Sequence, residues 1–331
     1  MGSVEKLSAA ELLSREFAQS RSALLKHLIT NEGMDPEDAS EFVSTLTKES
    51  GHSAYGFRCL HCGSFCSTSF RSESRTGRPA RTGGPPPDTM ISMDNCWEES
   101  ADAWIAEMGE HGDFGRRYVL DPVMLPRALA RSPQKVLDVG CGEGRFCRML
   151  KGSGVTCVTG IDPTPGLIRA ARARDAGGSY VESSAESLPF GDRSFDLVVS
   201  YLSLIDIADL RAAIFEMARV LRPGGALLIA NLNSFNTAGG GWIKDGDGQR
   251  VHYPIDHYLR ERPLLIEYRG IRVVNHHRPL SAYFRELLGA GLRLTYFDEP
   301  APSVEASPSR AASYRRVPWF LVMEWTKPSN G

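Results

Sequence analysis

One stretch restricts what this chain can fold into more than any other, because an apolar run leads there into a carboxylate and three glycines. It covers Val136–Phe146, VLDVGCGEGRF, with the acidic residue at Asp138 and glycines at Gly140, Gly142 and Gly144. Glycines allow positive φ angles and let a ligand approach the backbone closely. The helix start that follows offers free N–H groups and a positive dipole end, which suit an anionic group. The pattern therefore predicts a buried strand, a tight turn and the start of a helix.

Two kinds of cofactor site begin with such a turn. A dinucleotide site requires G-x-G-x-x-G, but Arg145 stands where the last glycine of that pattern belongs. Asp138, two residues before the first glycine, would face a positive amine rather than a pyrophosphate. The stretch resembles motif I of the class I S-adenosylmethionine (SAM) methyltransferases, whose pattern is acidic-x-Gly-x-Gly-x-Gly.

The second predicted strand ends in another carboxylate. The segment Val155–Ile161 reads as a second buried strand and leads into Asp162, which lies 22 positions after Gly140. This spacing matches an acidic residue that accepts hydrogen bonds from two ribose hydroxyls. Asp162 could instead cap the helix predicted over Pro165–Arg174. Because the glycine turn stands upstream, we favour the ribose role.

Two later loops complete the resemblance to the cofactor site of this family. The family often has Asp at the position of Ser184, after the third strand, where a hydroxyl or the N–H of Ala185 can still hydrogen-bond adenine. Family members place the residues after the fourth strand, predicted over Phe195–Ser200, beside the methionine part of SAM. The resemblance thus implies cofactor contacts from Asp138, Gly140, Cys141, Gly142, Asp162, Ser184, Ala185, Ser200 and Leu202.

The same resemblance predicts the fold. It runs from about Trp97 to Lys327 and includes Leu221–Leu227, LRPGGAL, a phrase very common in this methyltransferase-11-like family. It implies an α/β protein with a Rossmann-like, mostly parallel sheet of seven strands between helices, the last strand antiparallel. A helical extension precedes this domain. The activity implied is that of a SAM-dependent methyltransferase, with SAM as the cofactor.

Composition divides the chain into three parts. Residues 1–70 predict a helical extension with a Cys-rich turn, residues 71–92 a disordered linker, and residues 93–331 the methyltransferase domain. In the first part, one turn resembles half of a zinc ribbon. Its ligands would be Cys59, Cys62 and Cys66. Tetrahedral zinc usually needs a second C-x-x-C pair, which the chain does not contain, so no metal site is predicted.

The substrate side has no comparable motif. The aromatic-rich lead-in over residues 94–130 covers the cofactor in the methyltransferases that it resembles. Residues 233–263 read as a long irregular insertion, which we interpret as a lid or pocket wall. Residues 301–316 are expected to form a polar loop. The predicted substrate-pocket residues are Tyr118, Trp242 and Tyr253.

Methyl transfer asks for few catalytic groups, because the methyl sulfonium is already reactive and the enzyme must mainly align the acceptor and exclude water. A hydroxyl acceptor would benefit from a general base, and histidine suits neutral pH. His276 and His277 are the predicted catalytic residues, with a merely exposed or hydrogen-bonded role as the alternative. Asp206, after the fourth strand, could orient a substrate, but we favour a cap for the next helix.

Methylation of oxygen or carbon in a small molecule is the leading hypothesis. The net charge of −2 gives no case for nucleic-acid or membrane partners. Ser200–Ser203 also stands where an Asn-Pro-Pro-Tyr signature would favour amino-group methylation. The alternatives are methylation of tRNA or protein, or a SAM-binding module without catalysis. Seven cysteines, no membrane-length apolar run and no signal peptide predict a cytoplasmic protein, and nothing indicates its oligomeric state.

Overall fold

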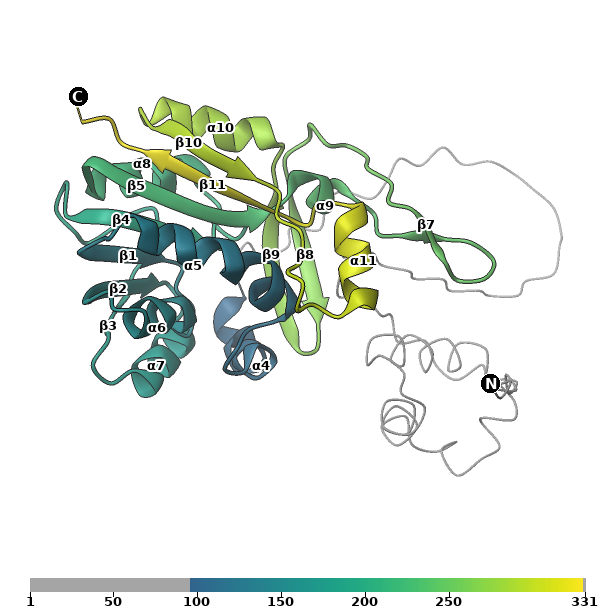
Figure 1. Ribbon diagram of the computed structural model, residues 1–331, viewed down its shortest axis with the longest axis horizontal. Coiled ribbons are helices and arrows are strands. Elements are labelled where there is room, and N and C mark those ends of the chain that lie inside the picture. The colour runs from purple at the N-terminus through teal and green to yellow at the C-terminus, as the bar shows by residue number, and fades with distance from the viewer. Residues whose placement is uncertain (1–95, 330–331) are drawn as a thin grey trace, which may run out of the picture. The chain divides into compact units, whose positions relative to one another are not determined.

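A sheet of seven strands organises residues 96–329, which are the residues that the computed structural model describes (Figure 1). The strand order is β10-β11-β5-β4-β1-β2-β3. β11 pairs antiparallel with both of its neighbours, β10 and β5, and all other pairs in this sheet are parallel, which confirms the fold class predicted from the sequence. The strands are β1 (Lys135–Val139), β2 (Cys157–Asp162), β3 (Ser179–Glu182), β4 (Phe195–Tyr201), β5 (Leu221–Leu232), β10 (Arg293–Asp298) and β11 (Phe320–Thr326).

Helices cover both faces of the sheet (Figure 1). They are α4 (Trp97–Met108), the π-helix η1 (Arg116–Leu120), α5 (Asp121–Ala130), α6 (Arg145–Gly152), α7 (Pro165–Arg174), α8 (Leu210–Val220), α9 (Ser234–Ala238), α10 (Leu280–Gly289) and α11 (Pro308–Arg316). The helix predicted over Pro165–Arg174 is confirmed with those bounds. None of the helices in the described range is long and apolar enough to cross a membrane.

The central strands are apolar on both faces because each face carries its own core. Residues of β4 alternate between the two: Leu197 and Val199 belong to the cluster with α5 and α6, whereas Val198 belongs to the cluster with α8 and α10. This alternation is the side-chain period of a strand. Strands buried on both faces read as continuous apolar runs, which is why β1, β2 and β4 were visible in the sequence.

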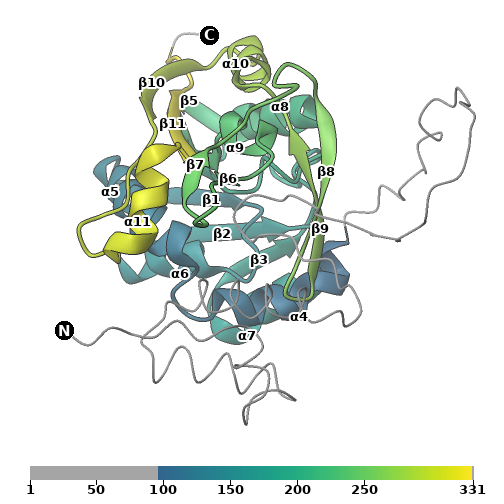
Figure 2. The same ribbon diagram turned by 90° about the vertical axis from the view of Figure 1, so that its right-hand side faces the viewer.

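A hairpin stands where the sequence did not predict one. The strands β8 (Arg262–Tyr268) and β9 (Ile271–His277) pair antiparallel, joined by Arg269 and Gly270, both with positive φ. That is the turn geometry that suits a tight hairpin. Figure 2 shows the hairpin beside α4, where the Ser100 hydroxyl donates to the Arg272 carbonyl and accepts from its N–H, both at 2.8 Å. The insertion before it holds only α9 and the short strands β6 (Ile243–Lys244) and β7 (Arg250–His252).

Two further expectations about local structure are wrong. The loop predicted over residues 301–316 contains α11, because Tyr314 is buried against Trp319 and Phe114, with ring centroids 5.2 and 5.0 Å away. The cap of α8 is Asp209, whose carboxylate accepts from the Ala212 N–H at 2.9 Å, and not Asp206. The predicted extension and linker, including Cys59, Cys62 and Cys66, lie outside the described residues.

Candidate functional site

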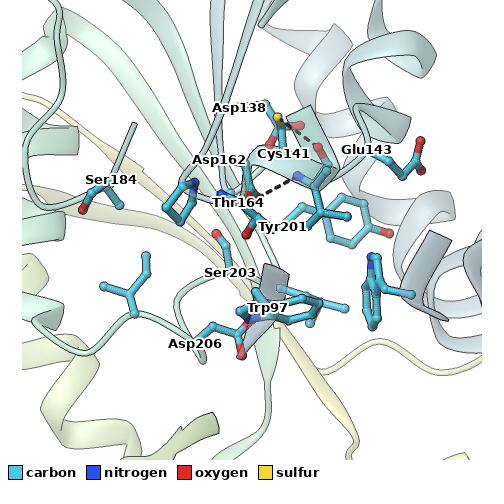
Figure 3. Close-up of a pocket in the computed structure, with 18 of the residues that line it drawn as sticks. Trp97, Asp138, Cys141, Glu143, Asp162, Thr164, Ser184, Tyr201, Ser203 and Asp206 are labelled. Carbon is cyan, nitrogen blue, oxygen red and sulfur yellow. Dashed lines mark hydrogen bonds between the residues drawn. The ribbon is translucent and has the colours of Figure 1, made fainter. Parts of the chain in front are cut away.

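A cavity of about 380 Å³ opens where the strands β1, β2 and β4 end (Figure 3). Its volume lies within the range of small-molecule sites. The walls come from the turn after β1, the ends of β2 and β4, the loop after β3, and from α4 and β9. Ligands of open α/β sheets bind at this edge, outside the carboxyl ends of the strands.

The glycine turn is built so that its backbone lies against both the cavity and the sheet. Gly140, Gly142 and Gly144 have φ values of +75°, +55° and +78°. A Cβ atom at Gly140 would come within 2.3 Å of the Ser203 Cβ atom, so only glycine fits there. The N–H groups of residues 140 and 141 both donate to the Ile161 carbonyl at 2.8 Å. The turn is therefore held against β2 and leaves its open side to a ligand.

Asp162, at the end of β2, stabilises the same turn through hydrogen bonds. Its side chain is buried, Oδ2 accepts from the Gly142 N–H at 2.9 Å, and Oδ1 accepts from the Thr164 N–H at 2.9 Å. Burial raises the pKa of this carboxyl. Since each carboxylate oxygen has more than one acceptor position, Asp162 can stabilise both loops and still accept ribose hydroxyls.

Asp138 presents an unsatisfied oxygen to the cavity. The residue is 1 % exposed, and Oδ2 accepts from the Cys147 thiol at 3.3 Å. Oδ1 is buried and has no hydrogen-bond partner. Burial raises the pKa of Asp138 to about 7. A buried acceptor without a partner is costly, and the positive amine expected of the cofactor would satisfy it.

The loop after β3 places Ser184 and Ala185 on the cavity wall. The Ser184 hydroxyl donates to the Glu186 carboxylate and accepts from the Glu186 N–H at 3.2 Å. Its proton is therefore engaged within the loop. Glu186 lines the cavity as well.

The end of β4 contributes Leu202 but not Ser200. Leu202 lines the cavity with a φ of +58°, a conformation that is uncommon outside glycine. Ser200 is fully buried, does not line the cavity, and shares a hydrogen bond of 2.7 Å with the Ser203 hydroxyl. Because successive strand residues point to opposite faces and its neighbour Tyr201 lines the cavity, the Ser200 side chain points away from the cavity.

The two predicted catalytic histidines point to different places. His276 lines the cavity, and burial lowers its pKa, which favours the neutral imidazole. His277 is fully buried outside this cavity, with Nδ1 2.7 Å from the Thr237 hydroxyl and Nε2 2.9 Å from the Tyr258 carbonyl. Because a carbonyl only accepts, Nε2 carries the proton and Nδ1 accepts. Both ring nitrogens of His277 are occupied, and the geometry does not support a catalytic role for it.

The predicted substrate-pocket residues do not line the cavity. Trp242 and Tyr253 pack together with ring centroids 5.3 Å apart, and Tyr118 packs on Phe114 at 5.2 Å. These rings belong to an aromatic cluster that includes Tyr314 of α11 and Trp319, which directly precedes β11. Aromatic rings gain stability from such edge-to-face and tilted contacts. No residue of the 233–263 insertion lines the cavity, so it does not form the pocket wall expected of it.

The aromatic wall comes instead from α4, through Trp97, Trp104 and Met108. The two indole rings meet edge to face at 5.0 Å. The Arg116 guanidinium lies 4.9 Å from the Trp104 ring centroid and pairs with Asp113 at 2.7 Å. The sequence placed aromatic residues in this lead-in, but the periodicity of one helix could not show which of them face a distant sheet edge.

The comparisons with known proteins agree with this geometry. Residues 137–229 match the family model described as a methyltransferase domain. A malonyl-[acyl-carrier protein] O-methyltransferase of Serratia marcescens is 32 % identical over 158 residues, which are 47 % of this chain and 59 % of that protein. The ubiquinone/menaquinone biosynthesis C-methyltransferase UbiE of Shewanella halifaxensis is 33 % identical over 130 residues, 37 % of this chain and 52 % of that protein. The chain thus spans little more than half the length of these curated relatives.

Solved structures extend the similarity to a larger share of the chain. A putative SAM-dependent methyltransferase from Listeria monocytogenes has a TM-score of 0.56 and 27 % identity, over 61 % of this chain and 94 % of that one. A SAM-dependent methyltransferase from Mesorhizobium loti has a TM-score of 0.55 and 28 % identity, over 62 % and 99 %. The strand order and these similarities together show that residues 96–329 have the fold of the class I SAM-dependent methyltransferases, and residues 137–229 match the methyltransferase-domain model.

Proposed function

We propose that this chain transfers the methyl group of SAM to an oxygen or carbon atom of a small molecule. One observation carries the proposal: a single cavity of about 380 Å³ gathers the glycine turn, Asp162, the loop after β3 and the unsatisfied oxygen of Asp138. When bound, SAM supplies a methyl group that is already electrophilic. The protein then has to hold the acceptor in line with that methyl group and exclude water.

The residues present fit this cofactor. Asp162 offers acceptor positions for the ribose hydroxyls, and Asp138 Oδ1 offers an acceptor for an amine. The Ala185 N–H is the donor we assign to the adenine ring, since the Ser184 hydroxyl is engaged with Glu186. On this assignment α4 covers the opposite side, so that its tryptophans exclude water from the reacting atoms.

The relatives support a small-molecule acceptor but differ in the acceptor atom. Their names specify O-methylation in Serratia marcescens and C-methylation in Shewanella halifaxensis. Both arginines of the cavity already pair with carboxylates, Arg116 with Asp113 and Arg145 with Asp121, which leaves little charge to attract a phosphate backbone. We therefore favour a small molecule over nucleic acid. The cytoplasmic location stays a prediction.

Calorimetric titration with SAM and with S-adenosylhomocysteine tests the cofactor assignment. We expect micromolar binding by wild type and a loss of about tenfold or more in Asp162→Ala, the equivalent of at least about 1.4 kcal/mol. Asp192→Ala is the matched control, because that exposed carboxylate pairs with Arg219 and does not line the cavity. Absence of binding by folded wild type would contradict the proposal. Binding would justify a screen for labelled methyl transfer to small molecules.

A further inference from the structure

The cavity contains a carboxylate for which the cofactor has no evident use. Asp206 lies in the loop between β4 and α8 and lines the cavity, and its Oδ1 atom is buried without a hydrogen-bond partner. Figure 3 shows Asp206 near the bottom of the view and Asp138 near the top, and both line the cavity. Among the described residues, Asp138 and Asp206 are the acidic residues with such a buried, unsatisfied oxygen. Asp138 belongs to the cofactor motif, but Asp206 does not.

Apart from Asp138, the other carboxylates of the wall and its two arginines have partners. Arg116 and Arg145 form ion pairs, and Glu186 accepts from Ser184. Glu143 accepts from two arginines, at 2.6 and 2.8 Å. Because folding rarely leaves a buried charge unpaired, the unsatisfied oxygen of Asp206 points to a ligand group that donates to it.

Asp206 is not required to shape its own loop. Arg278 donates to the carbonyls of residues 204, 207 and 208 at 3.2, 2.6 and 2.9 Å, and the His276 N–H donates to the Ile205 carbonyl at 2.7 Å. Asp209 caps the helix that follows. These hydrogen bonds hold the loop in place without the Asp206 carboxylate, which is therefore left available to a ligand.

We propose that Asp206 accepts the proton of a neutral hydroxyl acceptor, so that the substrate class is an alcohol or a phenol. This inference rests on the proposed function. In the step, a bond forms between the acceptor oxygen and the methyl carbon, and the bond between sulfur and that carbon breaks. The hydroxyl proton passes to Asp206 Oδ1 and later to solvent. The products are a methyl ether and S-adenosylhomocysteine.

The surroundings of Asp206 favour this role. Burial and the charge of Asp162 raise its pKa, while Arg116 and Arg278 act in the opposite direction. Tyr268 of β8 and Tyr283 of α10 also lie within its electrostatic reach, and His276 of β9 lines the same cavity. A raised pKa makes a carboxylate a better proton acceptor. The positive sulfonium of bound SAM would favour the ionised form at the moment when a base is needed.

The same carboxylate disfavours an acceptor that is itself an anion. A malonyl thioester, named for the Serratia marcescens relative, presents a carboxylate that needs no base. Such a group beside Asp206 would place like charges together in a buried site, which is unfavourable. The inference therefore predicts a neutral hydroxyl as the acceptor of this chain, in contrast to the anionic carboxylate of the relative's acceptor, although both acceptor atoms are oxygens.

Cofactor analogues test the position of Asp206 without knowledge of the acceptor. Sinefungin carries an amine where the transferable methyl group of SAM stands, and S-adenosylhomocysteine carries nothing there. We expect wild type to bind sinefungin about tenfold more tightly than S-adenosylhomocysteine, because a charged amine donates to a carboxylate strongly. In Asp206→Asn that preference should fall to about one, with the affinity for S-adenosylhomocysteine unchanged. Calorimetry measures both.

Two control variants make each outcome interpretable. Asp209→Asn removes a charge three residues away and keeps a good helix cap, so it should retain the preference. His276→Gln should retain it as well. A preference that survives in Asp206→Asn, or that disappears in His276→Gln instead, would overturn the inference while leaving the proposed function intact. Failure of wild type to bind S-adenosylhomocysteine would overturn the proposed function itself.

Methyl transfer provides the second test. Labelled SAM is incubated with a panel of phenols, alcohols and carboxylic acids. We expect transfer to hydroxyl compounds, with kcat in Asp206→Asn lower by about a hundredfold or more and KM for SAM unchanged. The wild-type rate should fall toward low pH as the base becomes protonated, and the variant should lose that dependence. Transfer to carboxylic acids at the same rate in both proteins would refute the assignment.

Discussion

The two sides of the cavity are assembled in different ways. On the cofactor side, Asp138, Asp162 and Ser184 each stand at the end of a strand or just after it, and β1, β2 and β3 are neighbours in one sheet. On the acceptor side, Trp97, Asp206 and His276 come from a helix, a loop and a hairpin that are far apart in the sequence. The cofactor side is thus a product of local turns on a common frame, whereas the acceptor side depends on how separate elements pack.

The largest effect should come from the glycine turn, where two substitutions separate close packing from backbone conformation. Gly140→Ala places a Cβ atom 2.3 Å from the Ser203 Cβ atom, whereas a Cβ atom at Gly142 meets nothing within 4 Å. We expect Gly140→Ala to lower the free energy of unfolding by about 3 kcal/mol through overpacking. Gly142→Ala should lose only about 1 kcal/mol through its positive φ. Urea denaturation of both proteins measures the difference, and equal losses would show that packing against Ser203 does not constrain the turn.

Substitution of the two neighbouring histidines should distinguish a structural role from a catalytic one. His277→Ala removes two buried hydrogen bonds, to Thr237 and to the Tyr258 carbonyl, and should lower the free energy of unfolding by about 2 kcal/mol. His276→Ala should leave stability within about 0.5 kcal/mol. Thermal unfolding tests the pair. A His277→Ala protein that is fully stable but loses methyl transfer would restore the catalytic role predicted from the sequence.

The pH dependence of stability should reveal the buried carboxylate of the cofactor motif. The pKa of Asp138 rises from an ordinary 3.8 to about 7 on folding, so the folded state holds this proton more tightly than the unfolded state. The resulting stabilisation is present below pH 3.8 and is lost as pH rises through about 7. The slope is at most about 1.4 kcal/mol per pH unit.

Asp138→Asn lacks this titration. We therefore expect wild type to become less stable relative to Asp138→Asn as pH rises from 5 to 7, and the difference to level off above that range. Denaturant midpoints of the two proteins at several pH values give the comparison. Parallel curves over the whole range would mean that the carboxylate is not buried in the folded protein.

The smallest effect should come from the link between α4 and the hairpin. Ser100→Ala removes the hydroxyl that both donates to and accepts from the Arg272 backbone, and should lower the free energy of unfolding by about 1 kcal/mol. Hydrogen exchange should quicken in β9 and not in β1. Ser194→Ala, at an exposed loop hydroxyl bonded to Gly191, is the control. If Ser100→Ala changed the exchange rates of β9 and β1 equally, the contact would not be what holds α4 and β9 together.

The sequence predicted the sheet well because the relevant signals are local. Apolar residues dominate β1 and β4, Val158 and Ile161 mark β2, and three glycines with positive φ mark the turn between β1 and α6. The hairpin β8–β9 was missed, although Arg269 and Gly270 form a tight turn between two strand-like segments. Its strands pair only with each other, so they lack the long apolar runs of the central sheet.

The side chains of the acceptor side were harder to predict, since their directions depend on packing. Tyr118, Trp242 and Tyr253 are aromatic residues in irregular segments, which is typical both of pocket walls and of the aromatic packing that they form. Asp206 and Asp209 both precede α8 within one turn, and only the helix start determined which of them caps it. Because α8 begins directly after Asp209, Asp206 is not its cap and instead lines the cavity.

The sequence by itself determined the order of the cofactor-site motifs along the chain, the glycine turn, and the carboxylates at the ends of β1 and β2. These features follow from local conformation and from the side-chain period of strands. The tertiary structure alone decided which residues line the other side of the cavity. Trp97, Asp206 and His276 converge through the packing of α4 and the β8–β9 hairpin at the sheet edge. Contacts between distant segments depend on the burial of many side chains together, which no single stretch encodes.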